Sequence, residues 1–180
     1  MGAKHRHRLC AIRKERELWE RLSKVGAELL VETLKQVEQG TAPREKQGDD
    51  FTMAPMLSKE MSKIDWENKS AIEIKNLVRG LNPIMGAYSF LEGKKIKFWK
   101  VNVLTDKELF EKFPELSKYE DRYYELFPGT ILFSDPKIGL LIKTEDGVID
   151  VLEIQGENAK KMNIKDFLRG NKLYAASIFE

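Results

Sequence analysis

Residues 70–91 read SAIEIKNLVRGLNPIMGAYSFL, and this stretch marks the change from helix to strand that decides the fold. Ser70 and Glu73 have the spacing of a capping box, in which a hydroxyl and a carboxylate satisfy backbone N–H groups at a helix start. We expect the helix to end near Arg79. After Pro83 the apolar residues alternate with polar ones, which is typical of strands.

About five short strands and one late helix are expected downstream. The predicted strands are Ala87–Leu91, a strand containing Ile96, Phe98 and Val101, Thr130–Phe133, Gly139–Lys143 and Val148–Ile154. Asp146-Gly147 predicts a tight hairpin between the last two, and Ile164–Arg169 is expected to form the helix. Five short strands suit a small OB-like open β-barrel better than a doubly wound α/β sheet.

Two segments lie outside this strand pattern. Residues 105–127 are expected to be helical or irregular, divided by Pro114. Residues 14–39 predict one long amphipathic helix, because apolar residues recur at three- and four-residue steps. Its apolar stripe needs a partner surface, and residues 40–57 after it have the turn residues of a linker. The predicted fold class is therefore α+β, with a long N-terminal helix and linker before a barrel with flanking helices.

Composition restricts the class of protein. The 180 residues are 42% hydrophobic, which suits one domain with an appendage. No apolar run approaches the length of a membrane span, and the single cysteine, Cys10, cannot form an internal disulfide, which fits a cytoplasmic location. Residues 1–16 carry a net charge of +5 and the remainder −3. Any nucleic-acid binding must therefore come from local clusters of cations on a near-neutral body.

The stretch that decides the fold also resembles the joint between the two domains of methionyl-tRNA formyltransferases. The resemblance covers roughly residues 17–176. It rests on short runs in the family's order, which are Leu22–Leu34, Ala54–Glu60, Ile64-Asp65-Trp66, Gly80-Leu81-Asn82-Pro83, Gly86-Ala87-Tyr88, Pro128–Leu132, Asp146-Gly147-Val148, Glu153-Ile154-Gln155, Met162 and Asp166–Gly170.

The resemblance implies a division into three parts. Residues 1–40 would be a basic tail followed by the remnant last helix of the catalytic domain, 41–68 the interdomain linker, and 69–180 the C-terminal OB-like domain. The family's catalytic domain binds 10-formyltetrahydrofolate and carries an Asn, a His and an Asp. The only histidines here, His5 and His7, do not assemble that set. We therefore predict no catalytic, cofactor-binding or metal-binding residue, and an inactive chain that is a truncated, internally started or frameshifted product.

The family's linker and C-terminal domain present basic groups to initiator tRNA, and candidate residues follow from that resemblance. Binding the phosphates of a nucleic acid requires Lys or Arg on one face. The candidates are Lys59, Lys63, Arg79, Lys94, Lys95, Lys97, Lys160, Lys161, Lys165 and Arg169. Lys95 and Lys97 share one face of a strand. Solvated surface lysines are the alternative interpretation. Trp99, which breaks the strand alternation, is left open, whereas Trp66 and Phe98 are expected in the core.

The expected function is thus the tRNA-binding part of a methionyl-tRNA formyltransferase, with initiator tRNA and a catalytic-domain chain as partners. Two alternatives stay open. The chain can be an inert remnant or a module that self-associates through helix 14–39 and has no RNA partner. It can also be the C-terminal part of a related formyltransferase with another substrate.

Overall fold

The computed structural model describes residues 15–46, 48–53 and 55–180. The chain divides into two compact units, Met1–Leu57 and Ser58–Glu180. The predicted basic tail, with His5, His7 and Cys10, lies outside the described residues. The predicted linker, 41–68, spans the division between the units. Its last eleven residues lie in the second unit, and its role as an interdomain linker stays a prediction.

The first unit contains a single long helix among its described residues, α1 (Glu15–Glu38). Apolar side chains along α1 are more than half exposed, among them Leu22, Leu29, Leu34 and Val37. No helix in the described part of the chain is both long enough and apolar enough to cross a membrane.

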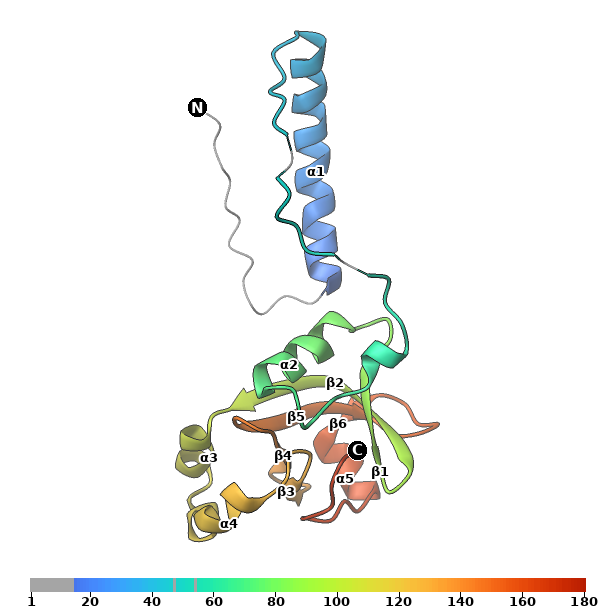
Figure 1. Ribbon diagram of the computed structural model, residues 1–180. Coiled ribbons are helices and arrows are strands. Elements are labelled where there is room, and N and C mark those ends of the chain that lie inside the picture. Colours follow the sequence, from blue (N-terminus) through green and yellow to red (C-terminus); the bar gives the residue numbers. More distant parts are fainter. Residues whose placement is uncertain (1–14, 47, 54) are drawn as a thin grey trace. The chain divides into compact units, whose positions relative to one another are not determined.

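The second unit contains the remaining elements (Figure 1). They are η1 (Glu60–Ser62), α2 (Ala71–Gly80), β1 (Ala87–Leu91), β2 (Lys94–Leu104), α3 (Asp106–Lys112), η2 (Pro114–Tyr119), α4 (Glu120–Glu125), β3 (Ile131–Asp135), β4 (Gly139–Lys143), β5 (Val148–Gln155), β6 (Met162–Asn163) and α5 (Ile164–Gly170). This mixed arrangement of helices and an antiparallel sheet confirms the coarse fold class. Pro114 does divide the 105–127 segment, since it begins η2.

The sheet of the second unit is antiparallel, with the strand order β1-β2-β5-β4-β3 and β6 paired to β5. The predicted Asp146-Gly147 hairpin joins β4 and β5, whose register pairs Lys143 with Val148. β1 and β3 end this path, and an edge strand exposes unpaired backbone groups unless something covers them. The OB-like barrel stays a prediction, because the strand path by itself is open.

The last residues of the chain cover both edge strands. Ile131 N–H donates to the Ser177 carbonyl at 2.8 Å and Phe179 N–H to the Gly129 carbonyl at 2.9 Å, which pairs the tail with the β3 side. Phe90 and Glu180 exchange backbone hydrogen bonds of 3.1 and 2.9 Å on the β1 side. The tail therefore satisfies backbone groups at both ends of the strand path.

The main core lies between the sheet and the helices that cover it. Trp66 and Phe98 are almost fully buried, as predicted. The Trp66 ring lies 5.9 Å from the rings of both Phe98 and Phe179, and its indole N–H donates to Ser89 Oγ at 2.9 Å. Ile64 N–H donates to the Tyr88 carbonyl at 2.8 Å. These contacts attach the segment before α2 to the sheet.

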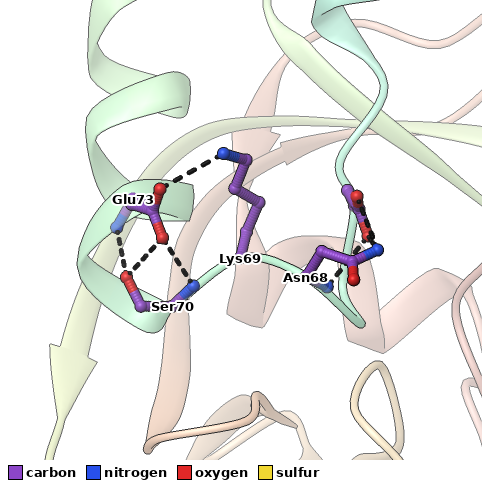
Figure 2. Close-up of polar contacts among 5 residues, drawn as sticks. Asn68, Lys69, Ser70 and Glu73 are labelled. Carbon is purple, nitrogen blue, oxygen red and sulfur yellow. Dashed lines mark hydrogen bonds and ion pairs between the residues drawn. The ribbon is translucent and has the colours of Figure 1, made fainter.

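The predicted capping box begins α2 (Figure 2). Ser70 Oγ accepts from the Glu73 N–H at 3.2 Å, and the Glu73 carboxylate accepts from the Ser70 N–H at 3.0 Å. Lys69 forms an ion pair with the same carboxylate at 3.2 Å. The pKa of Glu73 is held below its ordinary value, mainly by the hydrogen bond from the Ser70 backbone and next by those from the Ser70 hydroxyl and Lys69. Asp146 accepts from the Ala71 N–H at 2.7 Å, which connects α2 to the β4–β5 turn.

A second, smaller core lies under α3 and α4. Leu109, Phe113 and Tyr123 are buried there against Leu141 and Val148 of the sheet. A further capping box begins α3, because Thr105 and Glu108 exchange the same pair of hydrogen bonds. Residues 105–127, expected to be helical or irregular, therefore form a packed helical subdomain.

Candidate nucleic-acid interface

The β1–β2 hairpin separates apolar from basic side chains by simple alternation. Its inner face carries buried residues such as Ile96 and Phe98. The antiparallel register places Tyr88 opposite Lys97 and Phe90 opposite Lys95 on the outer face. Lysines and aromatic rings therefore alternate across this face, as cross-strand neighbours.

Ammonium groups lie over the rings of this outer face. Lys95 Nζ is 3.6 Å from the centroid of the Tyr88 ring, and Lys63 Nζ is 5.9 Å from that of Phe90. Lys63 is the residue directly after η1. Its side chain reaches the outer face because the Lys63 backbone forms a bridge with Tyr88. A cation over an aromatic ring is attracted by the ring's quadrupole.

Trp99 extends this surface because it follows Lys95 and Lys97 at two-residue steps along β2. The register with β5 shifts between Phe98 and Lys100 and again before Val101, so Trp99 has no partner in the ladder. Such a bulge re-aims side chains. Phe98 and Val101 stay buried, and the half-buried Trp99 and exposed Lys100 lie between them. The bulge is why two consecutive residues, Trp99 and Lys100, separate the buried Phe98 and Val101.

The Trp99 ring is held by polar contacts and by two cations. Its indole N–H donates to Gln155 Oε1 at 2.9 Å. Lys97 Nζ lies 5.8 Å and Lys161 Nζ 5.5 Å from its ring centroid. We define the basic–aromatic face as the side chains that share these ring contacts, which are Lys63, Tyr88, Phe90, Lys95, Lys97, Trp99 and Lys161.

The Gly80-Leu81-Asn82-Pro83 and Gly86-Ala87-Tyr88 runs position Trp99. Asn82 donates its side-chain amide to the Trp99 carbonyl at 2.6 Å. Gly86 has a φ of 69°, and a Cβ on it would lie 3.0 Å from the Trp99 ring. Glycine is required here both for the left-handed backbone and for the close approach of the indole.

The electrostatics of the face favour an anionic ligand. Lys161 forms an ion pair of 2.5 Å with Glu153, and Lys97 Nζ donates to the Met85 carbonyl at 3.1 Å. Within the described residues, Lys63 and Lys95 form no ion pair. Four ammonium groups therefore gather around the rings of Tyr88, Phe90 and Trp99, and only that of Lys161 is paired with a carboxylate among the described residues.

The other predicted site residues lie elsewhere on the second unit. Lys59 is exposed before η1, Arg79 is half-buried in the last turn of α2, and Lys160 is exposed beside Lys161. Lys94 borders a hollow of about 360 Å³ that Lys172 also lines. On α5, Lys165 is exposed and Arg169 forms an ion pair with Asp166 at 2.6 Å. Among the described residues, no ion pair or cation–ring contact joins these six side chains to the basic–aromatic face.

Sequence reasoning missed several members of the site. The position of Phe90 could have been predicted from the sequence, because Phe90 lies two residues after Tyr88 in β1 and so shares its face. Gln155 and Glu153 had none as site residues, since they come from β5 and meet Trp99 and Lys161 only through sheet pairing.

A second candidate surface lies at α3 and α4. An apolar hollow of about 350 Å³ is lined there by residues that include Leu109, Tyr123 and Ile131. Beside it, the Tyr123 hydroxyl donates to Asp106, and Lys143 donates to the Thr144 carbonyl at 2.7 Å. Burial lowers the pKa of Lys143. Among the described residues, no group of three or more His, Cys, Asp or Glu side chains could hold a metal ion.

Comparison with known proteins identifies close relatives. Residues 56–172 match the family model described as formyl transferase, C-terminal domain. A methionyl-tRNA formyltransferase from Caldanaerobacter subterraneus subsp. tengcongensis is 38% identical over 91% of this chain and 47% of its own length. One from Agathobacter rectalis is 35% identical over 99% of this chain and 52% of its own length. The chain spans about half the length of the curated relatives it matches.

Solved structures share the fold. A variant of HypX from Aquifex aeolicus has a TM-score of 0.52 at 16% identity, covering 86% of this chain and 26% of that chain. HypX in complex with tetrahydrofolic acid has a TM-score of 0.50 at 18% identity, covering 78% and 22%. At these identities the likeness concerns the fold alone.

Proposed function

The chain belongs to the formyl transferase C-terminal domain family, and from this premise we propose that it is the tRNA-binding part of a methionyl-tRNA formyltransferase. That reaction transfers a formyl group from 10-formyltetrahydrofolate to the amino group of methionyl initiator tRNA in the cytoplasm. In this proposal a catalytic domain holds the folate and performs the chemistry. This chain supplies affinity for the tRNA. The names of the relatives support the assignment.

The basic–aromatic face is the observation that carries the proposal. The body of the chain is close to neutral, so a polyanion is attracted only where cations gather locally. Lys63, Lys95, Lys97 and Lys161 provide that local excess, from three separate segments of the chain. Binding of phosphates by lysines releases counterions and depends steeply on salt.

Two finer assignments belong to the same proposal. The hydrogen bonds of the 176–180 tail to both edge strands support an OB-like barrel that the tail closes. The similarity to relatives extends beyond residues 56–172 to as much as 99% of the chain. This extent supports α1 as the counterpart of the last helix of the catalytic domain, which would explain its exposed apolar side chains.

The test is a titration of the purified chain into labelled initiator tRNA at several salt concentrations. We expect wild-type binding that weakens steeply as salt rises. The double variant Lys95→Ala/Lys97→Ala should lower the affinity by roughly tenfold and the slope of log K against log salt by about two. The matched control is Lys107→Ala/Lys137→Ala, which removes the same charge from exposed positions outside the face.

Each outcome decides something. No wild-type binding at low salt would overturn the proposal and favour a self-associating or inert chain, which sedimentation would then distinguish. Equal losses for the two double variants would mean that net charge, not the face, attracts the tRNA. Equal binding of an elongator tRNA would show that this part contributes affinity without choosing the initiator.

A further inference from the structure

We propose that Trp99 is a stacking platform for one unpaired nucleotide base, with Lys97 and Lys161 placed for the phosphates on either side of it. The inference rests on the proposed function and makes it narrower, because phosphate binding alone does not require an exposed base. The ligand is thus a single-stranded segment of RNA, and the site is the Trp99 end of the basic–aromatic face.

Two hydrogen bonds anchor Trp99, which is not a member of the buried core cluster. The core aromatic residues of this region, Trp66, Phe98 and Phe179, pack with one another on the inner side. Trp99 lies on the other side of β2, fixed by the Gln155 hydrogen bond at its ring edge and by the Asn82 hydrogen bond at its carbonyl. A ring fixed in advance loses little conformational freedom when a ligand stacks on it.

The contacts around the ring match the chemistry of a nucleotide. Every base has a π-face that stacks on an aromatic side chain, and cations beside the ring can take the phosphates. Lys97 and Lys161 lie 5.8 and 5.5 Å from the Trp99 centroid. Lys161 is also held by Glu153, so its ammonium group stays near the ring.

These features favour an unpaired nucleotide over other anions. In a duplex the bases are stacked on one another and cannot reach a side chain. An acidic peptide would pair with the lysines but has no use for the fixed indole. The same pairing of ring and cation recurs at Tyr88 with Lys95 and at Phe90 with Lys63, which continues the surface for the neighbouring backbone.

The experiment compares binding of initiator tRNA, a single-stranded RNA of about twelve nucleotides and a duplex RNA of equal length. Trp99→Ala should weaken binding of the single strand by about tenfold, weaken the tRNA measurably, and leave the duplex unchanged. The salt slope should stay at the wild-type value, because no phosphate contact is removed. Trp99→Phe keeps a ring and should recover most of the affinity. Tyr124→Ala is the control, since Tyr124 is 61% exposed but lies outside the basic–aromatic face, in a hollow lined by Asp106, Lys107 and Glu111.

Several results would overturn the inference. They are single-strand affinity unchanged in Trp99→Ala, equal losses for single strand and duplex, and displacement of the single strand by an acidic peptide of equal charge. Thermal unfolding of both Trp99 variants separates lost stacking from lost folding. If the wild-type chain bound the single strand through Trp99 but not the tRNA, the tRNA-binding function would fail and the stacking site would stand.

Discussion

The basic–aromatic face and the α3–α4 subdomain use the same kinds of residue in opposite ways. Both contain a lysine over a tyrosine ring, with Lys95 over Tyr88 at 3.6 Å and Lys143 over Tyr123 at 4.5 Å. Lys143 is only 5% exposed, and burial lowers its pKa, so this side chain is part of the packed interior. Lys95 stays in contact with solvent. A cation over a ring therefore marks a binding surface only where water, and hence a ligand, can reach it.

The largest effect should come from the α3–α4 core. Leu109 is 1% exposed, so Leu109→Ala leaves a cavity and should lower the free energy of unfolding by about 3 kcal/mol. Urea denaturation measures this loss. Leu57→Ala is the control. Because Leu57 is exposed, this substitution should lower the free energy of unfolding by less than about 0.5 kcal/mol. If the variant is folded yet no longer binds tRNA, the two regions are coupled and the contrast between them breaks down.

The next effect should separate backbone strain from the placement of Trp99. Gly86 and Gly93 both have a positive φ, of 69° and 76°. An alanine at either position should therefore cost about 1–2 kcal/mol. Only Gly86→Ala places a Cβ 3.0 Å from the Trp99 ring, because Gly93 has no atom in reach. RNA binding and indole fluorescence should thus change in Gly86→Ala alone, and an equal change in Gly93→Ala would deny Gly86 its positioning role.

The two capping boxes allow the regions to be compared by a single kind of substitution. Ser70→Ala and Thr105→Ala each remove the hydroxyl that caps a helix, at a cost of about 1 kcal/mol. Both should lower the urea midpoint if the second unit unfolds as a whole. A loss for Ser70→Ala alone, with faster amide exchange in α3 for Thr105→Ala, would mean that the α3–α4 subdomain opens independently.

The smallest effect concerns pH. Hydrogen bonds from Ser70 hold the folded-state pKa of Glu73 below its ordinary value of 4.5. A carboxylate with a lowered pKa stabilises the fold above the unfolded pKa and loses this contribution as the pH falls through the folded pKa. Glu73→Gln should therefore be less stable at pH 7 but lose less stability than wild type between pH 5 and pH 3. Glu125→Gln, outside any capping box, should follow the wild-type profile in urea midpoints.

The sequence determined the features that depend on neighbours along the chain. The Ser70–Glu73 spacing set the start of α2, and the Asp146-Gly147 turn set the β4–β5 hairpin. Alternation along β2 placed Lys95 and Lys97 on one face, because successive side chains of a strand point to opposite sides. The capping box at Thr105 and Glu108 has the same spacing, so the start of α3 could have been predicted from the sequence in the same way.

Only the tertiary structure decided which distant residues meet. Lys63 and Lys161 reach the face from segments far apart in the sequence. Lys63 does so through its bridge to Tyr88 of β1, and Lys161 through its ion pair with Glu153 of β5. Trp99 is held in place because the Asn82 amide, the Gln155 side chain and the bare backbone of Gly86 coincide beside a bulge in β2. The physical reason is the range of the interactions. Caps, turns and alternation act over two to four residues, whereas strand pairing and ring contacts depend on where the whole chain folds.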